Sequence, residues 1–202
     1  MKMNPKSRWS ALTSEDVRKV SPALENYTRT SIEDDLWERP GLSPRDRSMV
    51  TASALIARNQ TVGMLHYFNI ALDNHVKASE LSELITHLAF YSGWSNAFSA
   101  VAIVKDIFEQ RGIGADQLPA VAPELLPLNE IAEAERAARV DQDFGTVAPG
   151  VVQYTTDLLF RDLWLRPALT PRDRAWSRSA RWWHPVRPRR FHITSIAPWT
   201  TA

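Results

Sequence analysis

Between Leu42 and Gly112, apolar residues recur at every third or fourth position, and no stretch alternates between apolar and polar residues for long. This spacing is typical of helices that bury one face, whereas alternation would indicate strands. We therefore predict an all-α fold with one helical core at residues 42–112. The pattern predicts four consecutive helices in that core, over about 44–59, 61–74, 78–92 and 95–111.

Residues that favour helix ends lie at the expected boundaries. Ser43 is the expected N-cap of the first helix, and Pro44 suits its first position. Asn59 tolerates the left-handed conformation that ends a helix. Gly93 ends the third predicted helix, and Gly112 closes the fourth.

The rest of the chain flanks this core. Residues 1–41 begin with a polar stretch and continue as a helical segment, which we expect to pack on the core. Residues 113–147 carry spaced prolines and then a stretch rich in alanine and glutamate. This composition predicts a linker with a connecting helix at about 129–140.

One segment of the sequence returns later in the chain. SPALENYTRTSIEDDLWERPGLSPRDRS, residues 21–48, is here called the N-segment, and APGVVQYTTDLLFRDLWLRPALTPRDRA, residues 148–175, the C-segment. Tyr27 returns as Tyr154 and Pro44 as Pro171, at one constant offset (154 − 27 and 171 − 44). The match predicts a tandem duplication whose second copy starts at residue 148 and is truncated at Ala175.

Residues 176–202 depart from this match. They contain four tryptophans, several arginines and no acidic residue. Three interpretations compete: a nucleic-acid-binding tail, a membrane-surface segment and out-of-frame translation. Codons read from their third base give, at Trp183-His184 and at Trp199-Thr200, the alanine and aspartate found at Ala57 and Asp73. We therefore interpret the residues from about 175 onward as a frameshift product and expect residues 176–202 to be disordered.

Three sequences in the core occur in a familiar order: PRDRSMVTASALIARNQ, MLHYFNIALDN and ELSELITHLAFYSGWSNAFSA. Together they resemble the carboxymuconolactone decarboxylase family, whose all-helical fold is shared with the alkylhydroperoxidase AhpD-like proteins. The resemblance implies an AhpD-like helical bundle that forms homo-oligomers and acts in aromatic catabolism without a cofactor. It also implies a lyase that decarboxylates a γ-lactone dicarboxylate, as in protocatechuate (β-ketoadipate-type) breakdown.

His66 is our first candidate for proton transfer. In AhpD-like proteins a CxxC pair and a following histidine form a peroxidase site; that histidine aligns with His66, which puts the cysteines at Asn59 and Val62. The chain has no cysteine, so peroxidase chemistry lacks its nucleophile. Decarboxylation needs a bound carboxylate, an electron sink in the substrate and a proton donor, which a histidine supplies. A hydrogen-bonded interface histidine is the alternative.

Glu83 and His87 lie one helical turn apart, so the carboxylate can orient the imidazole as an acid or base. An ordinary pair on a helix surface is the alternative. Arg45 and Arg47 can grip the two carboxylates of a muconolactone by forked hydrogen bonds. Their alternative role is structural, in the first turn of a helix. Histidines and aspartates are too scattered to predict a metal site.

Composition narrows the choice of partners. A formal net charge of +1 gives no reason to expect nucleic acid or an anionic membrane. The first residues contain no apolar leader, and no stretch approaches the roughly 20 apolar residues that span a bilayer. We therefore expect a cytoplasmic protein without cofactor or metal, whose partners are a small carboxylate or lactone substrate and further copies of itself. The alternatives are a non-catalytic oligomeric helical remnant and, third, a nucleic-acid-binding protein that uses the tail.

Three positions differ from the pattern of the family that the core resembles. His75 stands where a glycine is usual, and histidine is poorly suited to positive φ. Lys77 replaces the usual Ser or Thr cap, and Ser95 replaces the proline after Gly-Trp. We expect these changes to affect stability and activity rather than the fold.

Overall fold

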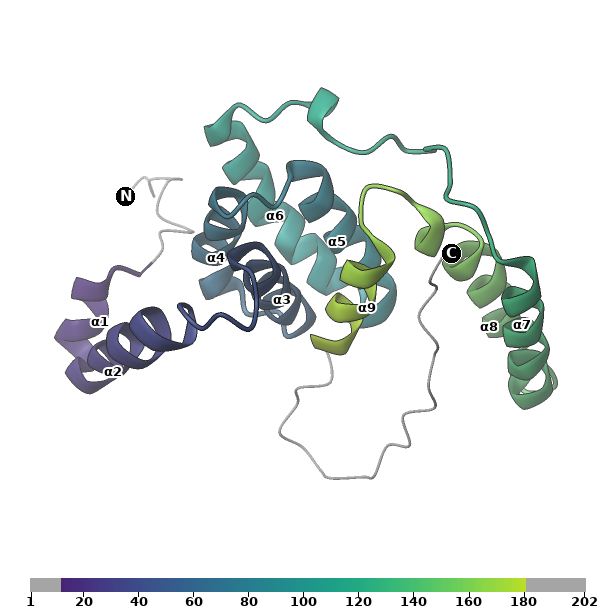
Figure 1. Cartoon of the computed structure of the whole chain (residues 1–202), viewed down its shortest axis with the longest axis horizontal. Helices are drawn as coiled ribbons and strands as arrows, with labels where there is room; N and C mark the ends of the chain where they lie inside the picture. Colours follow the sequence, from purple (N-terminus) through teal and green to yellow (C-terminus); the bar gives the residue numbers. More distant parts are fainter. Residues whose placement is uncertain (1–11, 181–202) are drawn as a thin grey trace, which may run out of the picture.

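The computed structural model describes residues 12–180, and no strand occurs among them (Figure 1). The core helices are α3 (Pro44–Ala57), α4 (Thr61–Asp73), α5 (Ala78–Ser92) and α6 (Trp94–Arg111). Their bounds agree closely with the four helices that the apolar pattern predicts. The predicted all-α fold is therefore confirmed for this part of the chain.

The residues expected at the helix ends adopt the expected conformations. The Ser43 hydroxyl accepts a hydrogen bond from the backbone N–H of Asp46 at 3.0 Å, which caps α3. Asn59 has a φ of 51° directly after α3, and Gly112 has a φ of 65° after α6. Gly93, between α5 and α6, has a φ of 96°, which side-chain-bearing residues rarely adopt. Helices α3, α5 and α6 thus end where the local sequence lowers the cost of a reversal.

The hydrophobic core lies between these four helices. Each contributes fully buried side chains, among them Met49, Phe68, Leu84 and Ile103. Leu169 of the C-segment is also fully buried in the same cluster. The C-segment is therefore packed on the core at residues 42–112 instead of standing apart from it.

The described part of residues 1–41 forms an arm at one end of the molecule (Figure 1). It consists of α1 (Ser14–Val20), α2 (Pro22–Tyr27) and the π-helix η2 (Thr28–Leu36). None of these residues is buried, so the arm packs on the core less than the sequence suggests. It meets the core where Trp37 stacks on Tyr67 of α4, with ring centroids 5.9 Å apart.

A second arm follows the linker on the opposite side of the core (Figure 1). The linker contains the 3₁₀ turn η3 (Ala115–Gln117) and leads to α7 (Glu130–Phe144), close to the predicted connecting helix. The Asn129 side chain caps α7 by accepting from the N–H of Ala132 at 3.2 Å. Helix α8 (Pro149–Tyr154) packs against α7, and the π-helix η4 (Thr155–Phe160), which packs against α8, completes this arm.

The chain then returns to the core through η5 (Leu163–Leu165) and α9 (Pro171–Ala180), which packs on α3 and α5. The expected loss of order after Ala175 is wrong for the next five residues, because α9 continues to Ala180. In this stretch Ser177 is fully buried, and its hydroxyl donates to the Arg174 carbonyl at 2.9 Å. Residues 181–202, to which the same prediction applies, lie outside the described residues.

Candidate functional site

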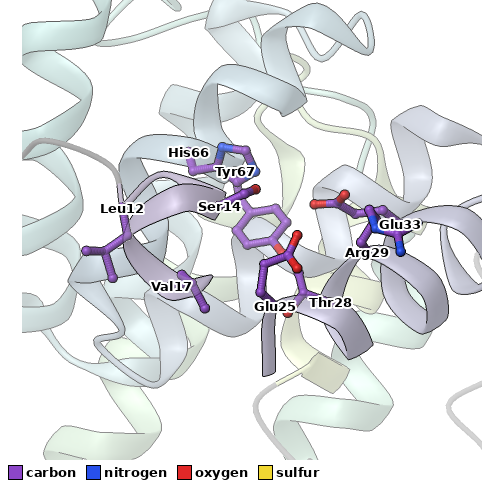
Figure 2. Close-up of a pocket in the computed structure, with 9 residues that line it drawn as sticks. All are labelled: Leu12, Ser14, Val17, Glu25, Thr28, Arg29, Glu33, His66 and Tyr67. Atoms are coloured by element: carbon purple, nitrogen blue, oxygen red, sulfur yellow. The ribbon is translucent and has the colours of Figure 1, made fainter. Parts of the chain in front are cut away.

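His66 lines a pocket of about 160 Å³ between the first arm and α4 (Figure 2). Because His66 and Tyr67 are neighbours near the middle of α4, both reach this side of the core. Their rings make an edge contact with centroids 5.0 Å apart. The arm supplies the remaining lining residues, which are Leu12, Ser14, Val17, Glu25, Thr28, Arg29 and Glu33.

The pocket combines one cation with two carboxylates. Arg29 lies 3.5 Å from Asp34, and Glu25 and Glu33 line the pocket with it. Burial, and then the negative charge of Glu33, raise the pKa of Tyr67 above its usual value. The Tyr67 hydroxyl therefore stays protonated at neutral pH and can donate a hydrogen bond. The exposed His66 imidazole adds a group that can pass protons to and from water.

Glu83 and His87 lie elsewhere, buried on the face of α5 that meets the C-segment. Glu83 accepts hydrogen bonds from the guanidinium groups of Arg166 and Arg174, with the closest N···O distances at 2.7 and 3.0 Å. Arg174 is fully buried and also contacts Nδ1 of His87 at 3.3 Å. One carboxylate and two arginines thus form an ionic cluster beside the imidazole.

His87 is neutral in this cluster. Burial, together with the positive charges of Arg174 and Arg178, lowers the pKa of His87 to about 3. An arginine only donates hydrogen bonds, so Nδ1 of His87 accepts and the proton lies on Nε2. Nε2 is buried without a hydrogen-bond partner among the described residues, and the ring packs against Tyr91 and Trp164. A group with this pKa does not donate protons near pH 7.

Arg45 and Arg47 both have structural partners. Arg45 bridges Asp173 at 2.8 Å and Glu80 at 2.6 Å, and the hydrogen bond to Asp173 is the main reason why the pKa of Arg45 is raised. Arg47 donates to three backbone carbonyls just before α3, those of Trp37, Arg39 and Leu42. Neither arginine lines the His66 pocket.

The structure therefore separates the predicted site residues into three places. Glu83 and His87 come together, His66 lies in the pocket of α4, and the two arginines hold the start of α3. Sequence analysis did not single out Arg166 and Arg174, although the offset between the two segments matches Arg174 with Arg47. It also did not single out Arg29, because nothing in the sequence shows that the arm approaches α4.

Comparison with known proteins agrees with this helical core. Residues 22–106 match the model of the carboxymuconolactone decarboxylase family. The 4-carboxymuconolactone decarboxylase of Acinetobacter baylyi is 26% identical over 104 residues, which cover 52% of this chain and 78% of that protein. The nitrosuccinic acid decarboxylase npaB of Metarhizium robertsii is 27% identical over 70 residues, 35% of this chain and 49% of that protein. Both relatives are named as decarboxylases.

Among residues 12–180, no helix is long and apolar enough to cross a membrane. Within the same residues, no group of three or more His, Asp or Glu side chains is placed to hold a metal ion.

Proposed function

We propose that this chain decarboxylates a small carboxylic acid without a cofactor, and that the reaction takes place in the pocket beside His66. The substrate class is a γ-lactone dicarboxylate. The proposal is supported by one observation: His66, Arg29 and Tyr67, whose raised pKa keeps it protonated, line the same pocket. The two relatives support the reaction type because both are named as decarboxylases.

The residues of the pocket suit the two steps of such a reaction. Arg29 holds the carboxylate that stays on the substrate. The carbon–carbon bond to the other carboxylate breaks, carbon dioxide leaves, and the electron pair moves onto the lactone carbonyl. Tyr67 donates a hydrogen bond to the oxyanion that forms, and His66 then protonates the carbon and regains its proton from water.

The two glutamates favour the loss of one carboxylate in particular. Glu25 and Glu33 line the same pocket as Arg29, so a substrate carboxylate that is not on Arg29 meets negative charge. Departure of that group as neutral carbon dioxide removes the repulsion. The arrangement therefore distinguishes the carboxylate that is held from the one that is lost.

Replacement of the histidine tests this assignment. His66→Gln is expected to slow the release of carbon dioxide from 4-carboxymuconolactone by about 100-fold or more, the usual contribution of a positioned acid or base. Its helical circular dichroism should stay unchanged. His75→Asn is the matched control, because His75 is an exposed histidine outside the pocket and asparagine tolerates its positive φ. Equal rates in wild type and His66→Gln would remove His66 from the mechanism.

A non-catalytic oligomer is the second candidate. It is favoured by the ionic cluster, in which Glu83 and His87 are held by Arg166 and Arg174 and leave no free acid or base. A wild-type chain that turns over neither a lactone dicarboxylate nor nitrosuccinic acid would favour this candidate.

The proposal extends to the assembly of the chain. On the outer side of α5 and α6, Phe90, Trp94, Phe98 and Val101 form an exposed apolar stripe, and the Phe98 side chain is 63% exposed. A contiguous patch of this kind on a soluble domain marks a contact with another protein. The stripe belongs to residues 42–112, through which the chain assembles as a homo-oligomer.

The proposal also covers the origin of the C-segment. Residues 148–175 are the truncated start of a second copy of the family domain, and the reading frame changes near Ala175. Support comes from the constant offset between the two segments and from the similar carbonyl contacts of Arg47 and Arg174. Sequencing of the gene around the codon for Ala175 tests it.

A further inference from the structure

The N-segment and the C-segment exchange ion pairs across α3 and α9. Arg45 binds Asp173 at 2.8 Å, and Arg172 binds Asp46 at 2.8 Å. The offset between the segments makes Arg45 equivalent to Arg172, and Asp46 equivalent to Asp173. Each arginine thus binds the aspartate of the other segment, which is the mark of a two-fold arrangement. Figure 1 shows α3 and α9 side by side at its centre.

The equivalent arginines Arg47 and Arg174 hold the same local fold. Arg47 donates to the carbonyls of Arg39 and Leu42, and Arg174 donates to the equivalent carbonyls of Arg166 and Leu169. Arg174 in addition crosses to α5. This second contact, with Glu83 and His87, has no counterpart at Arg47 in the described chain.

The two-fold arrangement predicts which element would contact Arg47. If Arg174 binds helix α5, then Arg47 faces the position of an equivalent helix from a second domain. Arg39, the equivalent of Arg166, has a side chain that is 62% exposed and forms an ion pair with Asp35, one helical turn away. Trp37, the equivalent of Trp164, completes this surface.

We propose that the surface formed by Trp37, Arg39 and Arg47 is a docking site for α5 of a second copy of this chain. Glu83 of the second copy is the group that it takes, because two arginines and a carboxylate reproduce the contact seen with Arg166 and Arg174. In the wild-type chain, residues 163–180 of the same chain cover this face of α5 and take the place of the second copy. Release of that segment exposes Glu83 and allows two chains to pair.

Each contact in such a pair has an equivalent within the single chain. Across a two-fold axis, Arg45 of each chain would meet Asp46 of the other, as Arg45 now meets Asp173. Glu83 of each chain would meet Arg39 and Arg47 of the other. This inference rests on the match between the two segments and not on decarboxylation, so a catalytically inactive chain leaves it standing.

Charge reversal in the full chain tests the inference. In the double variant Arg166→Glu, Arg174→Glu, two carboxylates face Glu83 and release the segment from α5. Light scattering should then give at least twice the mass of the wild-type particle. Addition of Arg39→Glu should return the mass to the wild-type value, whereas addition of Arg18→Glu, an exposed arginine on α1, should not. A folded double variant with the wild-type mass would overturn the proposal.

Cysteine cross-linking gives an independent test if the double variant does not fold. The chain has no cysteine, so every disulfide comes from the introduced residues. The variant Arg39→Cys, Glu83→Cys releases the segment by removing the partner of Arg166 and Arg174. It keeps the Arg45–Asp46 pairs between chains and puts thiols at the Arg39–Glu83 contact, so mild oxidation should join two chains covalently. The control Arg18→Cys, Glu83→Cys should remain uncoupled. Equal cross-linking in the two variants, or none in either, contradicts docking at Arg39.

Discussion

The guanidinium of Arg174 lies fully buried with its Nη2 atom 3.0 Å from Oε2 of Glu83. Burial is the main reason why the pKa of Arg174 is lowered, while its bond to Glu83 acts in the opposite direction. An arginine nevertheless keeps its proton in proteins, so the charge is retained and must be compensated. Glu83 therefore stabilises the packing of the C-segment on the core.

Removal of that carboxylate charge should be costly. Glu83→Gln leaves the buried Arg174 without a counter-ion, and we expect the free energy of unfolding to fall by about 3–5 kcal/mol. Denaturation with urea, followed by circular dichroism, measures the change. Glu109→Gln, on the exposed face of α6, is the control and should change stability by less than about 0.5 kcal/mol. Similar losses in the two variants would show that Arg174 is solvated in solution.

Stability should fall as the pH drops from about 6.5 to about 3 because of His87. Its pKa is lowered to about 3 in the folded chain, whereas an unfolded histidine titrates near 6.5. Between these values the unfolded state binds the extra proton, so acid favours unfolding by up to about 1.4 kcal/mol per pH unit. The contribution is fully present above pH 6.5 and is lost as the pH falls towards 3.

His87→Asn isolates this effect, because an asparagine oxygen can still accept from Arg174 but does not titrate. We expect the free energy of unfolding of wild type to fall more steeply than that of His87→Asn between pH 6.5 and 5, where few carboxylates change charge. Urea denaturation at three pH values measures the two slopes. Parallel slopes would mean that His87 takes up its proton without unfolding.

His75 occupies a backbone conformation that favours glycine. Its φ is 66° directly after α4, and it stands where the sequence analysis expects a glycine. Left-handed backbone costs a residue with a side chain about 1–2 kcal/mol, so His75→Gly should raise the free energy of unfolding by about 1 kcal/mol. Asn59→Gly, at a φ of 51°, should gain less because asparagine tolerates this region. The opposite order of the two gains in thermal denaturation would contradict this account.

Features that depend on neighbouring residues could be predicted from the sequence, whereas contacts between distant residues could not. Helix α3 could be bounded from the sequence because Ser43 and Asn59 act on the nearest turns of the backbone. The partners of Arg45 could not be predicted, since Asp173 is 128 positions away and is brought near by packing of α9. The ionic nature of the Glu83 site was missed for the same reason.

The lining of the His66 pocket could be predicted only in part. The sequence identified His66 by resemblance to a family, but Arg29 reaches the pocket only through the placement of an arm with no buried residue. Apolar periodicity predicts how buried faces pair and says little about such an arm. The match between the N-segment and the C-segment did indicate one relationship between distant residues, because it makes Arg174 the equivalent of Arg47.

The exposed stripe on α5 and α6 gives the last prediction. Trp94, Phe98 and Val101 recur at helical spacing on α6, and Phe90 packs against Trp94 with ring centroids 5.0 Å apart. If this stripe is the contact between copies, a charge at its centre must be buried without a partner on assembly, which is strongly unfavourable. Phe98→Glu should therefore give monomers at micromolar concentration in light scattering, with unchanged helical circular dichroism.

Val121→Glu is the matched control for that change, because Val121 is 96% exposed in the linker and lies outside the stripe. Its mass should equal that of wild type. A stable wild-type monomer would count against assembly through residues 42–112. If Phe98→Glu keeps the wild-type oligomer while the wild type does assemble, the contact lies on another face, and the matching exposed residues Tyr27 and Tyr154 of the two arms become the next surfaces to test.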